Sequence, residues 1–125
     1  MESWKELDVW QKTHALVLRV YEVTAQFPAA ERYRLTDQLC RAASSVSANI
    51  VEGQSRQTTR EYLQFLYNAR GSLEETRYHL LLARDLQLLD TNVYTELETG
   101  YESASKMLNG LIQSLRRKED GRIKG

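Results

Sequence analysis

The chain has 125 residues, which suits one domain with a buried core and excludes a second. Hydrophobic residues make up 42% of it, with one proline, six glycines and no glycine-rich run, so a disordered chain is also excluded. Seventeen basic and seventeen acidic residues give a net charge of zero, which excludes a surface that is basic all round. A nucleic-acid site would have to be a local patch.

The sequence contains one cysteine, Cys40, which cannot form a disulfide within the chain. The protein therefore needs no oxidising compartment. The first residues contain no apolar run of signal length, and no segment approaches the roughly 18 apolar residues of a membrane span. We expect a cytoplasmic protein with no membrane partner.

The first predicted helix is apolar on two sides. Capping-box spacings place its start at Ser3 or Asp8, and Pro28 ends it after Phe27. The apolar residues of one side are Leu7, Trp10, Val17 and Tyr21, and those of the other are Val9, Leu16, Val20, Val23 and Phe27. A helix that is apolar on two sides is buried on two sides.

One of these two sides is expected to contact another copy of the chain. The predicted oligomer interface consists of Val9, Leu16, Val20 and Val23. Leaving these side chains in water would forgo about 1.5 to 3 kcal/mol each. The alternative is that the bundle itself covers both sides.

A second helix is predicted from Leu35 to Gly53, where a left-handed glycine is expected to end it. Its apolar seam comprises Leu39, Ala42, Val46 and Ile50, and a polar seam beside it comprises Gln38, Arg41, Ser45, Asn49 and Glu52. The polar seam is either a site for a ligand or partner or a structural feature. We favour the structural interpretation, in which Asn49 and Glu52 are buried and bond to backbone groups where the third helix starts.

A capping box at Thr58 and Glu61 starts the third helix, which is predicted to run about 45 Å to Leu89. Its seam comprises Tyr62, Leu66, Ala69, Leu73, Thr76, Leu80 and Ala83. Gly71 lies inside this helix and weakens it by about 1 kcal/mol relative to alanine. We therefore expect Gly71 to mark a close crossing with another backbone.

The last predicted helix starts at Asp90 or Thr91 and keeps a regular alternation of three and four residues to Leu115. Its seam comprises Tyr94, Leu97, Tyr101, Ala104, Leu108, Leu111 and Leu115. Residues 116–125 lose this period and are expected to form a frayed, flexible basic tail. Four helices with short connections predict an all-α, up-down-up-down antiparallel four-helix bundle formed by residues 1–115.

Three arginines are candidate nucleic-acid contacts. Arg70, Arg77 and Arg84 recur every seven residues, so they form a stripe along the third helix that could follow a phosphate backbone. Glu74 and Asp85 lie within reach of this stripe, and ion pairing is the commoner outcome for such charges.

The tail supplies a second basic group, formed by Arg116, Arg117 and Lys118. It is either an arm that contacts phosphates or a solubilising terminus that touches nothing. The terminus is the commoner case.

No catalytic constellation can be assembled from the sequence. A two-metal carboxylate site in a helical bundle needs Glu-x-x-His pairs from two helices, whereas Glu75 and His79 are four residues apart and the other histidine is His14. No nucleophile motif is present either. We expect no enzyme, no cofactor and no metal.

Residues spread over most of the chain resemble a known family. In and before the second helix they are Phe27, Pro28, Glu31, Tyr33, Leu35, Gln38, Arg41, Ala42, Ser45, Asn49, Ile50, Glu52 and Gly53. In the third helix they are Phe65, Leu66, Ala69, Gly71, Ser72, Leu73, Glu74 and Glu75, and in the last helix Lys106, Met107, Leu108, Gly110, Leu111, Ile112, Ser114 and Leu115. They resemble the small bacterial four-helix-bundle family named after proteins encoded in intervening sequences of 23S ribosomal RNA.

This resemblance also carries an expectation about function. The accessory protein of diversity-generating retroelements is similar to the family, which implies a homopentameric barrel that binds nucleic acid and a reverse transcriptase. Those accessory proteins are strongly basic, whereas this chain has no net charge. We expect a non-enzymatic homo-oligomer, a pentamer by resemblance, that binds RNA or DNA through its arginines. The alternative is a protein-interaction scaffold or accessory subunit without direct nucleic-acid contact.

Overall fold

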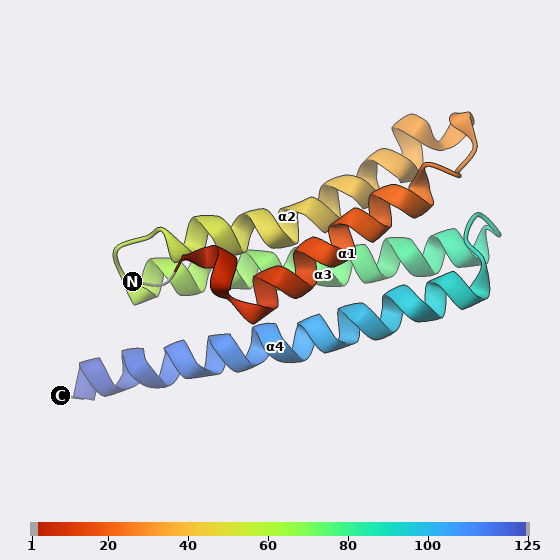
Figure 1. Cartoon of the computed structure of the whole chain (residues 1–125). Helices are drawn as coiled ribbons and strands as arrows, with labels where there is room; N and C mark the ends of the chain where they lie inside the picture. Colours follow the sequence, from red (N-terminus) through yellow and green to blue (C-terminus); the bar gives the residue numbers. More distant parts are fainter. Residues whose placement is uncertain (1–2, 125) are drawn as a thin grey trace.

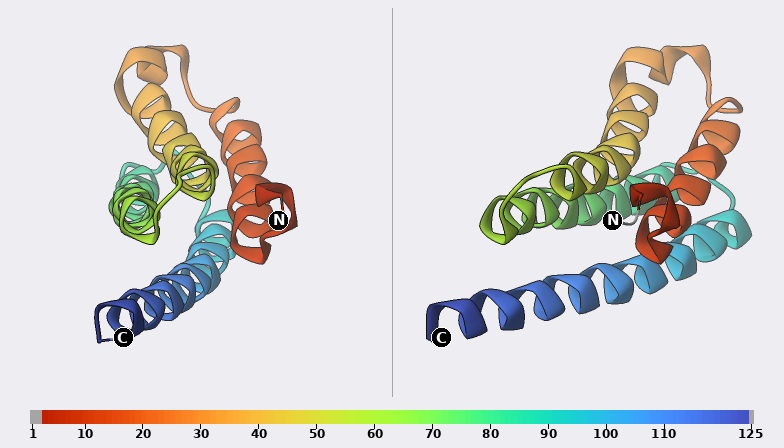
Figure 2. Two further views of the ribbon diagram at one scale, coloured as in Figure 1. Left: turned by 90° about the vertical axis from the view of Figure 1, so that its left-hand side faces the viewer. Right: turned by 60° about the vertical axis from the view of Figure 1, so that its left-hand side comes forward.

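The structure is a computed structural model that describes residues 3–124, with side chains through Gly121. Four α-helices and no strands occur among these residues, which confirms the all-α fold. The helices are α1 (Asp8–Thr24), α2 (Asp37–Gln54), α3 (Thr59–Asp85) and α4 (Thr91–Lys124). They run alternately in opposite directions, and each packs against the next, with α4 closing the bundle against α1 (Figures 1 and 2).

The chain enters α1 through a short 3₁₀ turn, η1 (Trp4–Glu6). Ser3 caps this turn and not α1, because its hydroxyl accepts the N–H of Lys5. An extended residue, Leu7, then redirects the chain, and Asp8 lies in the first turn of α1 with no side-chain cap before it. Helix α1 ends at Thr24, before the predicted Phe27.

The connection from α1 to α2 is itself helical. A 3₁₀ turn, η2 (Ala29–Glu31), is followed by a π-helical turn, η3 (Arg32–Thr36), which leads directly into α2. Gly53 lies inside α2 and does not end it in a left-handed conformation, so that prediction is wrong. Its missing side chain instead makes room for Tyr62, since a Cβ there would lie 2.8 Å from Tyr62 Cδ1.

The predicted starts of α3 and α4 are confirmed by their caps. Thr58 Oγ1 accepts the N–H of Glu61 at 3.1 Å and donates to the Glu61 carboxylate at 2.8 Å. Asp90 accepts the N–H of Asn92 on its carboxylate at 2.7 Å. Thr58 and Asp90 therefore each accept a hydrogen bond from a backbone N–H group that has no partner within its helix.

Helix α3 ends at Asp85 in a left-handed turn and does not reach Leu89. Gln87 has φ 62°, the N–H of Leu88 bonds to the carbonyl of Ala83, and the N–H of Gln87 bonds to the carbonyl of Arg84. These two bonds form a Schellman motif, in which the left-handed position is usually glycine.

The core follows the predicted seams. Fully buried side chains from three helices include Leu39, Val46, Ile50, Leu66, Leu73, Leu80, Leu97, Tyr101 and Leu108. A buried hydrogen bond of 2.9 Å from Ser47 to Thr13 joins α2 to α1. Gly71 faces open space, so the predicted close crossing there is wrong; the close approach is at Gly100, where a Cβ would lie 2.6 Å from Leu16 Cδ2.

The predicted oligomer interface lies inside the subunit. Val9, Leu16, Val20 and Val23 are at most 9% exposed. They are covered because α1 packs against both α2 and α4, whereas Tyr21, on the other predicted apolar side of α1, is 53% exposed. The prediction that these four residues contact another copy is therefore wrong.

The segment expected to be a frayed tail is helical. Helix α4 continues without a break through Lys124, and Gly125 lies outside the described residues. Its C-terminal end diverges from the other three helices (Figures 1 and 2). Arg116, Arg117 and Lys118 are exposed on this extension.

Candidate functional site

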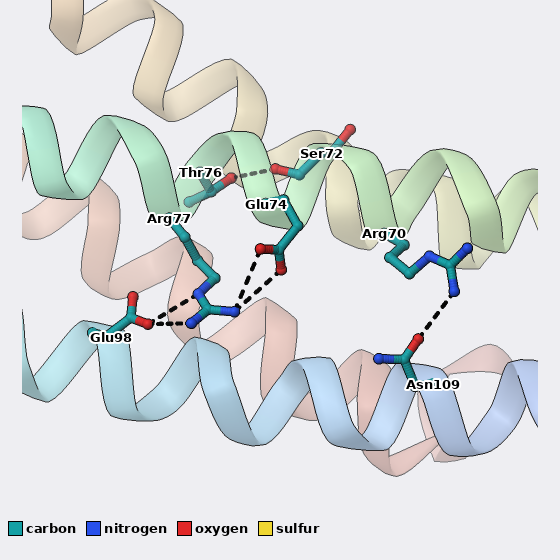
Figure 3. Close-up of polar contacts among 7 residues, drawn as sticks. All are labelled: Arg70, Ser72, Glu74, Thr76, Arg77, Glu98 and Asn109. Atoms are coloured by element: carbon teal, nitrogen blue, oxygen red, sulfur yellow. Dashed lines mark hydrogen bonds and ion pairs between the residues drawn. The ribbon is translucent and has the colours of Figure 1, made fainter.

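Two arginines of the stripe on α3, Arg70 and Arg77, reach toward α4 (Figure 3). Arg70, Arg77 and Arg84 lie on the side of α3 whose neighbours are polar and aromatic residues of α4. Antiparallel packing pairs the start of α3 with the end of α4, so each arginine meets a different part of α4. The three guanidinium groups consequently have three different environments.

Arg77 is neutralised by two carboxylates. Its Nε donates to Glu98 Oε1 at 3.0 Å, its Nη2 also pairs with Glu98, and its Nη1 lies 3.2 Å from Glu74 Oε2. The side chains of Arg77 and Glu98 are only 28% and 24% exposed. The hydrogen bond to Glu98 raises the pKa of Arg77 above its usual value, so the guanidinium group stays charged. A phosphate would have to compete with two carboxylates already in place.

Arg84 and Arg70 stack on tyrosines. Arg84 lies 4.7 Å from the ring centre of Tyr94 and pairs with Asp85 at 3.0 Å. Arg70 lies 5.2 Å from the ring centre of Tyr67 and donates to the amide oxygen of Asn109 at 3.2 Å. Among the described residues Arg70 has no carboxylate partner, so no ion pair compensates its positive charge at the surface.

A shallow hollow of about 300 Å³ lies beside Arg77 between α3 and α4. Its lining comprises Glu74, Arg77, Tyr78, Leu81, Tyr94 and Glu98. Tyr78 projects from its rim and is 59% exposed. Sequence reasoning missed Glu98, because its relation to the stripe depends on how α4 packs against α3. It also missed Tyr78, although Tyr78 directly follows Arg77 in the sequence.

The polar seam of α2 divides into buried and exposed parts. Ser45 exchanges a 2.9 Å hydrogen bond with Ser72 of α3, and Asn49 donates to the Ser45 carbonyl at 2.8 Å. Glu52 is exposed, as are Gln38 and Arg41, so the expectation of a buried Glu52 is wrong. Asn49 is half-buried and bonds within α2, so the expectation that it bonds where α3 starts is also wrong. Within the half-buried part of the seam, Ser45 joins α2 to α3 and Asn49 supports Ser45.

A second group of exposed basic residues lies at the end of the bundle that holds the α2–α3 turn and the end of α4 (Figure 1). The residues are Arg56, Arg60, Arg116, Arg117 and Lys118. Arg56 lies 4.5 Å from the ring centre of Phe65. Glu61, Glu119 and Asp120 occur at the same end, so the positive charge is only partly compensated.

The histidines are used for packing contacts. His14 is stacked on Trp10 with ring centres 4.8 Å apart, and His79 Nε2 lies 3.3 Å from Glu75. Within residues 3–121, no three His, Cys, Asp or Glu side chains are grouped so as to hold a metal ion. None of the described helices has an apolar stretch long enough to cross a lipid bilayer.

Comparisons with known proteins identify the family. A protein of unknown function from the S23 ribosomal protein family of Bacteroides thetaiotaomicron has a similar crystal structure, with a TM-score of 0.75 and 21% identity over 83% of this chain and 97% of that one. At this identity the likeness shows the fold alone. No functionally curated protein matches the sequence. The family model described as 23S rRNA-intervening sequence protein matches residues 5–110. The chain therefore belongs to the 23S rRNA-intervening sequence protein family.

Proposed function

We propose that this protein is a cytoplasmic, non-enzymatic scaffold that associates with copies of itself and presents its α3–α4 face to a protein partner. The observation that carries the proposal is the neutralised centre of the arginine stripe, where Arg77 is held by Glu98 and Glu74. Arginine and tyrosine are enriched at protein interfaces, and this face combines them with the half-buried Leu81.

Self-association is supported by the outer side of α1. Leu18 and Tyr21 are 59% and 53% exposed, and the stacked rings of Trp10 and His14 precede them on the same helix. Burying such side chains is favourable by about 25 cal/mol per Å² of apolar surface. These residues replace the incorrectly predicted interface, and the subunit number implied by the family resemblance is five.

The mass of the assembly in solution tests self-association. We expect light scattering after size exclusion to give a multiple of the subunit mass at micromolar concentration, and Leu18→Glu with Tyr21→Glu to give single subunits. The matched control is Tyr33→Glu, an exposed tyrosine elsewhere, which should leave the mass unchanged. A wild-type protein that stays monomeric at tens of micromolar would remove this part of the proposal.

Binding of a protein partner is tested by immobilising the tagged protein and measuring which proteins it captures in the presence of nuclease, which removes nucleic acid. We expect specific capture that is lost in Tyr78→Glu and retained in Tyr33→Glu. Arg70→Glu should have no effect on a partner that contacts only the hollow beside Arg77. Capture that disappears with nuclease would mean that nucleic acid bridges the two proteins.

Nucleic acid is a second candidate partner, favoured by the environment of Arg70. This arginine has neutral partners, Asn109 and Tyr67, and the exposed basic residues that begin at Arg116 follow Asn109 along α4. RNA or DNA binding should give a log affinity that falls linearly with log salt. Arg70→Glu with Arg116→Glu should flatten that slope, whereas Arg41→Glu, a change at an arginine paired with Asp37, should not. Absence of binding at low salt would eliminate this candidate.

A further inference from the structure

A second hollow lies where the start of α2 meets the end of α3. It has a volume of about 370 Å³, which is within the range of small-ligand sites. Leu35, Leu82 and Leu86 supply its apolar wall, and Tyr33, Gln38 and His79 supply its polar and aromatic groups. It lies on the side of α3 away from the arginine stripe, so neither proposed partner surface uses it.

The backbone around this hollow is irregular on both sides. Tyr33 and Leu35 belong to the π-helical turn η3, a rare conformation that often occurs at functional sites. Leu86 precedes Gln87, whose φ of 62° is the one positive value among the described residues. As a result Leu86 and Tyr33 remain 53% and 83% exposed beside the hollow.

Three side chains that line the hollow have unused binding capacity. His79 is only 7% exposed, and its Nδ1 atom is buried without a hydrogen-bond partner. The Gln38 amide has no hydrogen-bond partner among the described residues, and it offers both a donor and an acceptor. The exposed ring of Tyr33 offers a face for stacking.

The charges at the hollow are already balanced. Arg34 lies 3.7 Å from Glu31, and both side chains line the hollow. An anion or a cation entering the hollow would therefore meet a compensated pair and gain little net attraction. The groups that remain select a flat, uncharged molecule that both stacks and hydrogen-bonds.

We infer that this hollow binds a planar, uncharged heterocycle of nucleobase size, stacked on Tyr33 and hydrogen-bonded at its edge by Gln38. An amide side chain reads the paired donor and acceptor of a base edge, and aromatic rings stack on bases of any sequence. The leucines contact the rest of the ring.

Titration with adenosine, guanosine, cytidine and uridine, monitored by backbone amide NMR shifts, tests the inference. We expect at least one nucleoside to cause saturable shifts confined to η3, the start of α2 and the end of α3. Tyr33→Leu and Gln38→Leu should each weaken binding at least tenfold, and both positions are exposed, so folding is retained. The matched control Gln113→Leu, an exposed glutamine of α4 away from the hollow, should leave the affinity unchanged.

Further ligands separate the possible sources of the base. A nucleoside monophosphate should bind as tightly as its nucleoside, with no dependence on salt, whereas a single-stranded oligonucleotide bound here should lose affinity in Tyr33→Leu. Oligonucleotide binding that depends steeply on salt and ignores Tyr33→Leu belongs to the basic residues and counts against this site. Absence of saturable shifts, or equal binding of toluene, which cannot hydrogen-bond, would overturn the inference.

Discussion

Arg77 of α3 and Glu98 of α4 form the ion pair that joins the two helices at the centre of the arginine stripe. The Nε to Oε1 distance is 3.0 Å, and both side chains are less than one-third exposed. A carboxylate from α4 therefore occupies the position that a phosphate would need. For this reason we propose that Arg77 stabilises the packing of α3 against α4 and does not bind nucleic acid.

Removing this carboxylate should destabilise the fold. Glu98→Gln leaves a partly buried guanidinium with only Glu74, and we expect a loss of about 1 kcal/mol in the free energy of unfolding. The control is Glu102→Gln, which breaks an exposed pair with Lys106 at 3.6 Å and should cost less than about 0.5 kcal/mol. Urea denaturation measures both. Equal losses of unfolding free energy in the two variants would show that the pair between Arg77 and Glu98 stabilises the fold no more than an exposed pair does.

The pair between Arg19 and Glu96 should make stability depend on acid pH. Arg19 Nε donates to Glu96 at 2.8 Å and Nη2 at 3.0 Å, and these bonds hold the pKa of Glu96 below its usual value. A lowered folded pKa means that the contribution is present above the pKa of the unfolded chain and is lost as the pH falls through the folded pKa.

We therefore expect wild type to have a higher Tm than Glu96→Gln at neutral pH, with the difference closing below about pH 4. Thermal unfolding followed by circular dichroism across this range measures it. In an Arg19→Met background Glu96→Gln should have no pH-dependent effect. A constant difference at all pH values would contradict the assignment.

Tyr101 should be replaceable by phenylalanine without loss of stability. The side chain is fully buried, its hydroxyl has no hydrogen-bond partner, and burial raises its pKa well above the usual value. A raised folded pKa means that stability is retained below the unfolded value and lost as the pH rises beyond it. Tyr101→Phe should match or exceed wild-type stability at neutral pH, within about 1 kcal/mol.

The same variant should also resist alkaline unfolding better than wild type. Urea midpoints at neutral pH and at about pH 10.5 test this, since tyrosine in the unfolded chain ionises near 10. A large loss of stability at neutral pH would mean that the hydroxyl has a partner in the core.

Two glycines should respond to alanine in opposite directions. At Gly71 a Cβ meets nothing within 4 Å, so Gly71→Ala should stabilise α3 by about 1 kcal/mol. At Gly100 the Cβ would lie 2.6 Å from Leu16 Cδ2 in the buried contact between α4 and α1. Overpacking costs about 1 to 3 kcal/mol, which should cancel or exceed the gain in helix propensity. Denaturant unfolding of both variants gives the comparison, and similar stabilities would contradict it.

Gln87 should prefer to be glycine. Its φ of 62° lies in the left-handed region, where a side chain is strained, and no bond from its side chain compensates among the described residues. Gln87→Gly should raise the free energy of unfolding by up to about 1 kcal/mol. Gln113→Gly, an exposed position inside α4, should lower it by a similar amount. A loss of stability in both variants would mean that the Gln87 side chain stabilises the turn.

The sequence alone determined the four helices, their order and most of their buried faces. Periodicity, the caps at Thr58 and Asp90 and the break at Pro28 are local signals, and they act through backbone groups a few residues away. The arginine stripe could also be predicted from its spacing. Local signals were weaker at helix ends, where the left-handed turn was expected at Gly53 and occurs at Gln87.

The tertiary structure decided which surfaces were left free. Whether Val9 and Val20 faced another copy or their own bundle depended on α2 and α4 packing on two sides of α1. The partners of the arginines were decided in the same way, because Glu98 and Asn109 meet α3 only after α4 folds back along it. A close approach was expected at Gly71 and occurs at Gly100. The way α1 and α4 are aligned in the bundle brings Leu16 to Gly100, and the sequence of α4 alone does not reveal this alignment. Contacts between residues distant in the sequence have no local signal, and in this protein those contacts decide which side chains remain available to a partner.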